Sequence, residues 1–349
     1  QLGLDSEVQY WAEQAIAQGV ATAQAASGTL IMMDTKTGLI KAWAQAPTYN
    51  ANAYWTSPVA NFRDLAVANV YEPGSVEKVV TFAGGLNDHA ITPGYTFNEG
   101  PTTIDGATIR DWDGRAHGTI TMQRVLDESL NNGAIKVGQL MGPNAFYSNM
   151  LAFGVGAPTG VDLYGEQNVP LQSQDKWSAL DLAEAAFGQR VQVTPIEVLA
   201  AVNAVANGGV WVQPHAVQSV INPTTGSSAV VVPTSRRVIS AGAAATLAQM
   251  MTGVVEDRGG EGSLAKIPAF KGEVAGKTGT ASVATNGHYG NDVVVSFAGF
   301  LPAKNPRFTM LVVLNFPHET GVVRFGATLA APVWKQVAQV AIDQWRITP

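Results

Sequence analysis

Apolar residues recur at helical spacing near both ends of the chain. Near the start they predict an amphipathic helix over residues 6–26. A second helix is predicted over residues 328–345. The positions that define the first pattern are Val8, Trp11, Ala12, Ala15, Ile16 and Val20.

Capping residues predict two more helices in the middle of the chain. Thr194 followed by Pro195 is typical of a helix start, and this helix ends at residues 207–209, an Asn-Gly-Gly break. Ser240 begins an Ala- and Met-rich helix that reaches about Val255.

Apolar runs rich in β-type residues predict five strands. The first two flank a Thr-Lys-Thr-Gly turn and form a hairpin, and the other three lie near the end of the chain. Their ranges are 28–34, 39–44, 273–284, 293–301 and 308–316. Residues 48–205 have mostly helix and loop patterns, interrupted by Gly and Pro.

This order of elements predicts an α/β protein of the α+β type. We expect one antiparallel sheet of about five strands, covered by the two terminal helices, and a mainly helical lobe. The sheet lobe would comprise about residues 1–47 and 210–349, and the helical lobe about residues 48–209. A cleft between two lobes is a common place for an active site.

The composition excludes several classes of protein. Apolar residues make up 46 % of the 349 residues and charged residues 14 %, well below the roughly 25 % charge of typical soluble domains, so extensive disorder is excluded. A net charge of −6 offers no basic surface for nucleic acid. No apolar run reaches the roughly 18 residues that cross a bilayer, and the lack of cysteine removes disulfides, thiolate zinc sites and a cysteine nucleophile.

Metal and phosphate motifs do not fit well. The five histidines are scattered, with no pair at helical ligand spacing, so we expect no metal and no cofactor in the chemistry. The segment from Gly272 to Thr278 has one residue too few between its glycines for a phosphate loop, and a β-type run follows it. A Gly-x-Ser-x-Gly elbow is absent.

Three short motifs remain, in a fixed order: Ser75-Val76-Glu77-Lys78, Ser129-Leu130-Asn131 and Lys277-Thr278-Gly279-Thr280. Ser-x-x-Lys occurs three times, but only Ser75 follows a Pro-Gly break and begins a predicted apolar helix, which extends to about residue 86. Positions three apart share a helix face, so Lys78 can reach the Ser75 hydroxyl. Singly, the second motif is also explained as the end of a helix, and the third as an ordinary strand entry.

Together the motifs resemble the transpeptidase domain of class B penicillin-binding proteins, of the division-associated type. The lead-in Tyr71-Glu72-Pro73-Gly74 and the run Ala275-Gly276 before Lys277 are similar to the family pattern. Glu77 and Asn132 depart from it, and at i+2 Glu77 should point away from the nucleophile. The resemblance implies the serine β-lactamase and D,D-transpeptidase-like fold, and a soluble part of a longer protein that is anchored in the bacterial inner membrane and works on its extracytoplasmic face.

The resemblance also implies the roles of the residues. Ser75 is the nucleophile, Lys78 its base, Ser129 a proton relay, and Lys277 a second cation that keeps Lys78 neutral. Asn131 and the segment Thr278, Gly279 and Thr280 bind substrate, and the backbone N–H groups of Ser75 and Thr280 form the oxyanion hole.

The expected reaction is cross-linking of peptidoglycan stem peptides that end in D-Ala-D-Ala, through an acyl-serine that β-lactam antibiotics also form. In the full-length protein we expect a membrane glycosyltransferase and division-complex proteins as partners. A D,D-carboxypeptidase and a non-catalytic penicillin-binding sensor or scaffold remain alternatives. A β-lactamase is disfavoured because no Glu-x-x-Leu-Asn string occurs.

Overall fold

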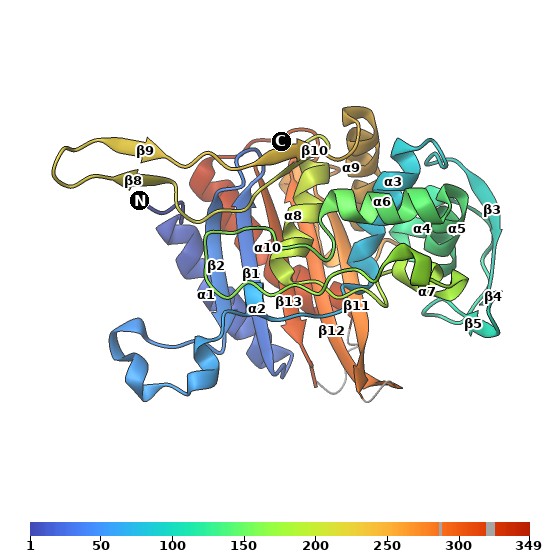
Figure 1. Cartoon of the computed structure of the whole chain (residues 1–349), viewed down its shortest axis with the longest axis horizontal. Helices are drawn as coiled ribbons and strands as arrows, with labels where there is room; N and C mark the ends of the chain where they lie inside the picture. Colours follow the sequence, from blue (N-terminus) through green and yellow to red (C-terminus); the bar gives the residue numbers. More distant parts are fainter. Residues whose placement is uncertain (286–287, 319–324) are drawn as a thin grey trace.

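The computed structural model describes residues 1–285, 288–318 and 325–349. Its centre is one antiparallel sheet of five strands, in the spatial order β11-β12-β13-β1-β2 (Figure 1). The strands are β1 Ser27–Asp34, β2 Ile40–Ala46, β11 Ala275–Thr285, β12 His288–Leu301 and β13 Phe308–Asn315. This confirms the five predicted strands, although β12 begins before the apolar run at Val293 that predicted it.

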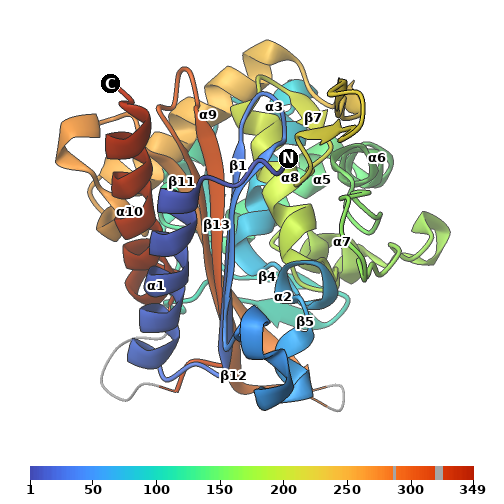
Figure 2. The ribbon, with the colours of Figure 1, turned by 90° about the vertical axis from the view of Figure 1, so that its left-hand side faces the viewer.

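The two terminal helices, α1 Ser6–Thr22 and α10 Gly326–Trp345, lie side by side on one face of the sheet (Figure 2). They approach closely at Gly19, where an added Cβ would lie 2.7 Å from Val333 Cγ2. Trp334 is fully buried and its Nε1 donates to Met310 O, which ties α10 to the sheet. The predicted end of the first helix at residue 26 is wrong, because Gln24 has a φ of 47° and turns the chain into β1.

The opposite face of the sheet is covered by helices from the middle of the chain. These are α8 Pro195–Ala206 on β12 and β13 and α9 Ala241–Glu256 on β11, and α3 Lys78–Asn87 packs in turn against both helices. Thr194 and Ser240 accept hydrogen bonds from the first turns of α8 and α9, as predicted. Every residue of α8 is buried, and Asn203 donates to Thr35 O and accepts from Thr309 Oγ1. A satisfied polar link of this kind fixes how α8 sits on the strands.

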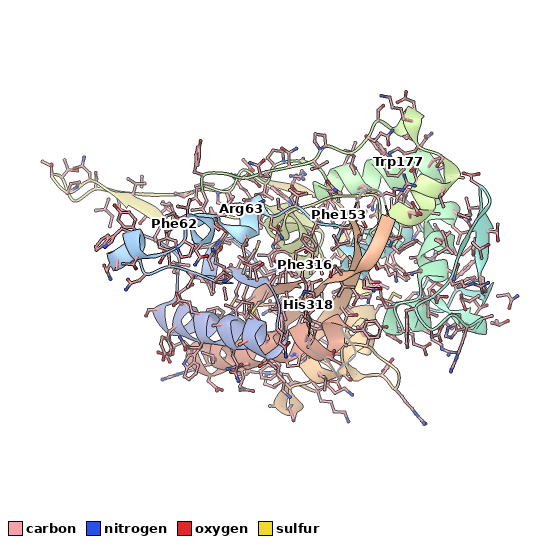
Figure 3. All side chains as sticks on the ribbon, turned by 90° about the horizontal axis from the view of Figure 1, so that it is seen from below. Phe62, Arg63, Phe153, Trp177, Phe316 and His318 are labelled. Atoms are coloured by element: carbon pink, nitrogen blue, oxygen red, sulfur yellow. The ribbon has the colours of Figure 1, made fainter. Side chains whose placement is uncertain are left out.

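Four helices gather at the right-hand end of the molecule in Figure 1: α4 Met122–Asp127, α5 Asn131–Met141, α6 Pro143–Phe153 and α7 Ala179–Ala185. The short helix α2 Leu65–Ala68 lies instead beside β1 and α8. Short 3-10 helices connect them and other parts of the chain: η1 Ala51–Thr56, η2 Val59–Phe62, η3 Gly74–Glu77, η4 Gln174–Lys176, η5 Ser263–Ala265 and η6 Pro268–Phe270. Seen from below, Phe62 and Trp177 lie toward opposite ends of the long axis (Figure 3). We retain the division into a sheet lobe and a helical lobe as a proposal.

Several short strand pairs were not predicted by the sequence patterns. They are β3 Thr96–Glu99 with β6 Gly118–Thr121, β4 Thr102–Ile104 with β5 Ala107–Ile109, β7 Val210–Val212 with β10 Ser235–Arg237, and β8 Ser219–Ile221 with β9 Ser228–Val230. The turn between β4 and β5 uses Asp105 and Gly106, both with positive φ, which suits a tight hairpin. Strands this short carry too few alternating positions to stand out from loop sequence.

Candidate active site

Ser75 lies where the chain turns into α3, beside the edge strand β11. Gly74 has a φ of 55°, and a Cβ there would lie 2.8 Å from Thr280 O. Only glycine therefore lets this turn pack against the strand. The predicted helix at Ser75 is confirmed, but its first turn is the 3-10 helix η3 and α3 begins at Lys78.

Lys78 is fully buried beneath Ser75. Its Nζ lies 3.0 Å from Ser75 Oγ, 2.6 Å from Ser129 O and 2.8 Å from Asn131 Oδ1. Burial, followed by the neighbouring Lys277, lowers the pKa of Lys78 well below its usual value, against the opposing charges of Glu261 and Asp111. The first and second motifs therefore meet around one lysine that favours its neutral form.

Ser129 connects the two lysines. It lies between α4 and α5 with a φ of 56°, a conformation that an L-residue adopts only where its surroundings hold it. Lys277 Nζ donates to Ser129 Oγ at 2.7 Å, and Lys78 Nζ lies 3.4 Å from the same oxygen. Burial lowers the pKa of Lys277 to about 8, although Glu261 and Asp127 oppose the shift.

The third motif lies on β11. Lys277 and Thr278 are buried, and Thr278 Oγ1 donates to Glu261 Oε2 at 2.9 Å. At Gly279 an added Cβ would lie 2.9 Å from Val76 Cγ2. This glycine therefore keeps η3 close to the strand.

A cavity of about 230 Å³ lies over these residues. Most of the predicted site residues line it: Ser75, Ser129, Asn131, Thr278 and Thr280. Lys78 and Lys277 are buried below it and contact its lining through hydrogen bonds. The structure therefore brings the three motifs into one site. Gly279 does not line the cavity but packs against Val76 of η3.

The cavity is also lined by Gly74, from the predicted lead-in, and by Gln189. The other lining residues have no signal in the sequence: Trp112, Phe187, Glu261, Ser282 and Phe325. Trp112 and Phe325 are in edge contact, with ring centroids 5.9 Å apart, although they come from distant segments. Such contacts depend on the tertiary fold, and no spacing in the sequence encodes them.

The two departures from the family pattern are both buried. Glu77 is 4 % exposed, and burial together with Glu197 raises its pKa to about 8. Its side chain is buried, so this departure from the family pattern affects local packing. Asn132 donates from Nδ2 to Asp111 Oδ2 at 2.9 Å.

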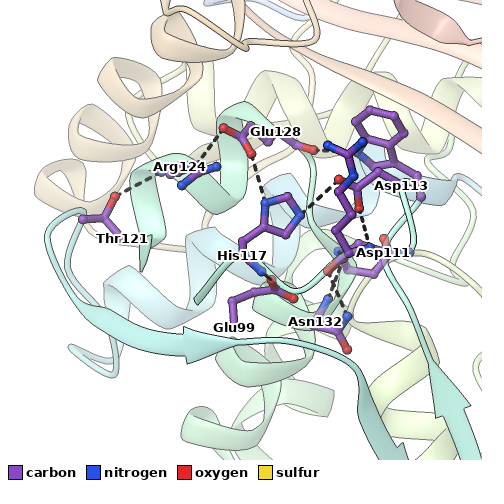
Figure 4. Close-up of polar contacts among 11 residues, drawn as sticks. Glu99, Asp111, Asp113, His117, Thr121, Arg124, Glu128 and Asn132 are labelled. Carbon is purple, nitrogen blue, oxygen red and sulfur yellow. Dashed lines mark hydrogen bonds and ion pairs between the residues drawn. The ribbon is translucent and has the colours of Figure 1, made fainter. Parts of the chain in front are cut away.

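Asp111 supports the second motif from a separate loop (Figure 4). Its Oδ1 accepts from the backbone N–H groups of Asn131 and Asn132 at the start of α5. A carboxylate at this position satisfies the free N–H groups of a helix N-terminus and interacts favourably with its dipole. Asp111 therefore holds Asn131 in place toward Lys78.

A half-buried serine hydrogen-bonded to a buried lysine at the start of a helix, beside a Lys-Thr-Gly edge strand, is the arrangement expected of the penicillin-binding transpeptidase class. Residues 28–339 match the family model described as the penicillin binding protein transpeptidase domain. The chain belongs to this family.

Named relatives fit this assignment. Stage V sporulation protein D of Bacillus subtilis is 30 % identical over the whole chain, which covers 54 % of that protein. Peptidoglycan D,D-transpeptidase FtsI of Escherichia coli is 29 % identical over the whole chain, which covers 56 % of it. The probable peptidoglycan D,D-transpeptidase PenA of Neisseria flavescens is 30 % identical, with 83 % of its length covered. The chain thus spans about half the length of several relatives.

Solved structures confirm the fold class. Penicillin binding protein 3 of Mycobacterium tuberculosis, in complex with aztreonam, superimposes with a TM-score of 0.92 at 28 % identity, over 99 % of this chain and 79 % of that one. The transpeptidase domain of Burkholderia pseudomallei penicillin-binding protein 3 gives a TM-score of 0.85 at 26 % identity, over 100 % and 97 %. Among the described residues, no helix is both long and apolar enough to span a membrane.

Proposed function

We propose that the chain is the catalytic domain of a peptidoglycan D,D-transpeptidase of the division-associated type. Its substrates are stem peptides that end in D-Ala-D-Ala, and β-lactams acylate the same serine. The observation that carries the proposal is the hydrogen bonding of Lys78. The family match and the names of the relatives support the same reaction.

A neutral lysine has two N–H groups and one lone pair. Two of the oxygens nearest to Lys78 Nζ, Ser129 O and Asn131 Oδ1, are carbonyl oxygens that can only accept. If they take the two N–H groups, the lone pair is left for the hydroxyl of Ser75, 3.0 Å away. This is the arrangement that a general base requires.

The first acyl transfer follows from this geometry. Ser75 Oγ attacks the carbonyl carbon between the two D-Ala residues, and its proton moves to Lys78 Nζ. The C–N bond then breaks, Ser129 passes its proton to the departing D-Ala amine, and Lys78 gives Ser129 the proton that it took from Ser75, across the 3.4 Å between Nζ and Ser129 Oγ. Because Lys277 donates to Ser129 Oγ, the Ser129 proton is free to point toward Lys78 or the leaving group.

Substrate binding uses the remaining motif residues. Asn131 Oδ1 accepts from Lys78, so its Nδ2 is available to a carbonyl of the substrate. Thr278 and Thr280, which lie on β11 on either side of Gly279, hold the terminal carboxylate of the substrate near Lys277. The backbone N–H groups of Ser75 and Thr280 stabilise the oxyanion, the largest electrostatic contribution in such reactions.

In the second transfer an amine of a neighbouring stem peptide attacks the acyl-serine. Its proton leaves through Ser129 and Lys78, and Ser75 regains its hydrogen while the cross-link forms. A D,D-carboxypeptidase would pass the acyl group to water, and a sensor or scaffold would stop at the acylated state. We further propose the extracytoplasmic face of the inner membrane as the location of the whole protein, with a membrane glycosyltransferase and division proteins as partners.

Intact-protein mass spectrometry after incubation with a penicillin tests the proposal. We expect a stable adduct of one penicillin per chain, absent from Ser75→Ala and retained in the matched variant Ser173→Ala, which changes another Ser-x-x-Lys. No adduct on the wild-type chain contradicts the proposal. With a stem peptide and a D-amino acid as acceptor, exchange of the terminal residue identifies a transpeptidase, and hydrolysis alone identifies a carboxypeptidase.

A further inference from the structure

A second polar cluster lies beside the active site and has no part in the proposed reaction (Figure 4). It consists of Glu99 at the end of β3, Asp111 in the loop before β6, and His117 immediately before β6. One ligand atom from each of the three lies within 4.8 Å of those of the other two. Glu99 and Asp111 are 1 % and 4 % exposed.

Two atoms of this cluster lack hydrogen bonds. Within the part of the chain that the structure describes, Glu99 Oε1 and His117 Nε2 are buried and make none. The other oxygen of Glu99 accepts from the backbone N–H of His117 at 2.8 Å, which fixes the carboxylate beside the imidazole. Buried polar atoms nearly always have a hydrogen-bond partner in native proteins, so Glu99 Oε1 requires one, whereas His117 Nε2 has only the carboxylate of Asp113 nearby.

A fourth group completes the surroundings of His117 Nε2. Asp113 Oδ2 lies 3.4 Å from this nitrogen. Two ligands each about 2.1 Å from a tetrahedral zinc ion are separated by about 3.4 Å. His117 Nε2 and Asp113 Oδ2 are therefore already as far apart as two ligands of one zinc ion. One imidazole with carboxylates is a donor set that suits zinc and similar divalent ions.

The groups around the cluster also fit a metal site. His117 Nδ1 faces Glu128 Oε2 at 3.6 Å, and Arg124 Nε holds Glu128 at 2.7 Å. A histidine ligand commonly has such a carboxylate on its other nitrogen, which orients the ring and makes it a better donor. Asp111 is likewise held by the N–H groups at the start of α5.

We propose that Glu99, Asp111, Asp113 and His117 bind a divalent ion of the zinc type. Four protein ligands leave no open position, so the ion is structural. It connects β3, the loop 111–117 and, through Asp111, the N-terminus of α5 that carries Asn131. Paired histidines and thiols are the usual signal of a zinc site in a sequence, and this site has one histidine and three carboxylates, so its residues carry no such signal.

Calorimetric titration of chelator-treated protein with Zn²⁺ tests the proposal. We expect one equivalent to bind with a dissociation constant below about 10 µM, and His117→Gln and Glu99→Gln to weaken binding by about tenfold or more. Glu13→Gln, the same change on exposed α1, is the matched control and should bind as the wild type does. Circular dichroism checks that each variant is folded.

Co²⁺ absorption of the wild-type chain gives a readout that does not depend on the variants. A tetrahedral site with one nitrogen and carboxylate oxygens produces strong visible bands without a thiolate charge-transfer band, and Zn²⁺ should abolish them. A wild-type chain that binds neither ion overturns the proposal, and the unpartnered atoms would then share a proton. Binding that is unchanged in both variants also overturns it, because the ion would lie elsewhere.

Discussion

Replacing Lys78 by methionine removes the proposed base with little change in side-chain length. Methionine cannot accept the proton of Ser75, whose Oγ lies 3.0 Å from Lys78 Nζ. General base catalysis contributes typically 10²- to 10⁴-fold, so we expect acylation by a penicillin to slow by that factor. The loss corresponds to about 3–5 kcal/mol of transition-state stabilisation.

The same replacement also destabilises the protein, and this effect must be separated from the effect on the acylation rate. Ser129 O and Asn131 Oδ1 lose the donor that Lys78 supplies. A buried acceptor left without a partner costs about 1–3 kcal/mol, and this applies to Ser129 O, since Asn131 is only half-buried. Urea unfolding of Lys78→Met therefore accompanies the kinetics, and the rates are compared only where the variant is folded. Lys36→Met is the matched control, because Lys36 is exposed and belongs to the Lys-Thr-Gly of the β1–β2 turn.

The assay is the second-order rate of adduct formation, followed by mass spectrometry across a range of pH. In the wild type the rate should be retained well below pH 10, because the pKa of Lys78 is lowered and its neutral form already exists there. It should fall above about pH 8, where Lys277 loses its proton and its attraction for the carboxylate. If Lys78→Met reacts within tenfold of the wild type, Lys78 is not the base.

Three further predictions concern neighbouring residues. Burial raises the folded-state pKa of Glu77 to about 8, so between about pH 4.5 and 8 the folded protein binds more protons than the unfolded chain. The free energy of unfolding is therefore highest below about pH 4.5 and decreases as the pH rises through this window. Urea unfolding should show that the stability of Glu77→Gln increases relative to that of the wild type from pH 5 to 8. A difference in the free energy of unfolding that stays constant over this range would refute the prediction. Gly279→Ala should slow acylation and lower the melting temperature, since its Cβ would meet Val76 at 2.9 Å; an unchanged melting temperature and rate would contradict it. Thr278→Val should weaken binding of a carboxylate-bearing β-lactam by about tenfold, the worth of one hydrogen bond, and inhibition kinetics that separate binding from acylation check this. Equal binding would remove Thr278 from that role.

The fold could be predicted where the patterns are long and capped. The five strands, α8 and α9 follow from apolar runs and from Thr194 and Ser240. The short strands β3 to β6 could not be predicted, because their pairing depends on contacts between segments. The end of α1 was misplaced because the positive φ at Gln24 is set by its junction with β1.

The site could be predicted to the extent that its motifs are contiguous. Ser75 and Lys78 share one helix turn, so their contact follows from spacing alone. That Ser129 joins both lysines depends on the fold, and only the resemblance to a known family led to it. Glu261 and Asp111 had no signal, because each acts on a motif from a distant loop.

A crystal structure of the chain after reaction with a penicillin tests the central claim most directly. The account predicts a covalent bond from Ser75 Oγ to the carbonyl carbon of the opened ring, with the carbonyl oxygen between the N–H groups of Ser75 and Thr280. Lys78 Nζ should remain within hydrogen-bond distance of Ser75 Oγ. A penicillin attached to any other side chain, or an acyl oxygen turned away from these two N–H groups, would contradict the account.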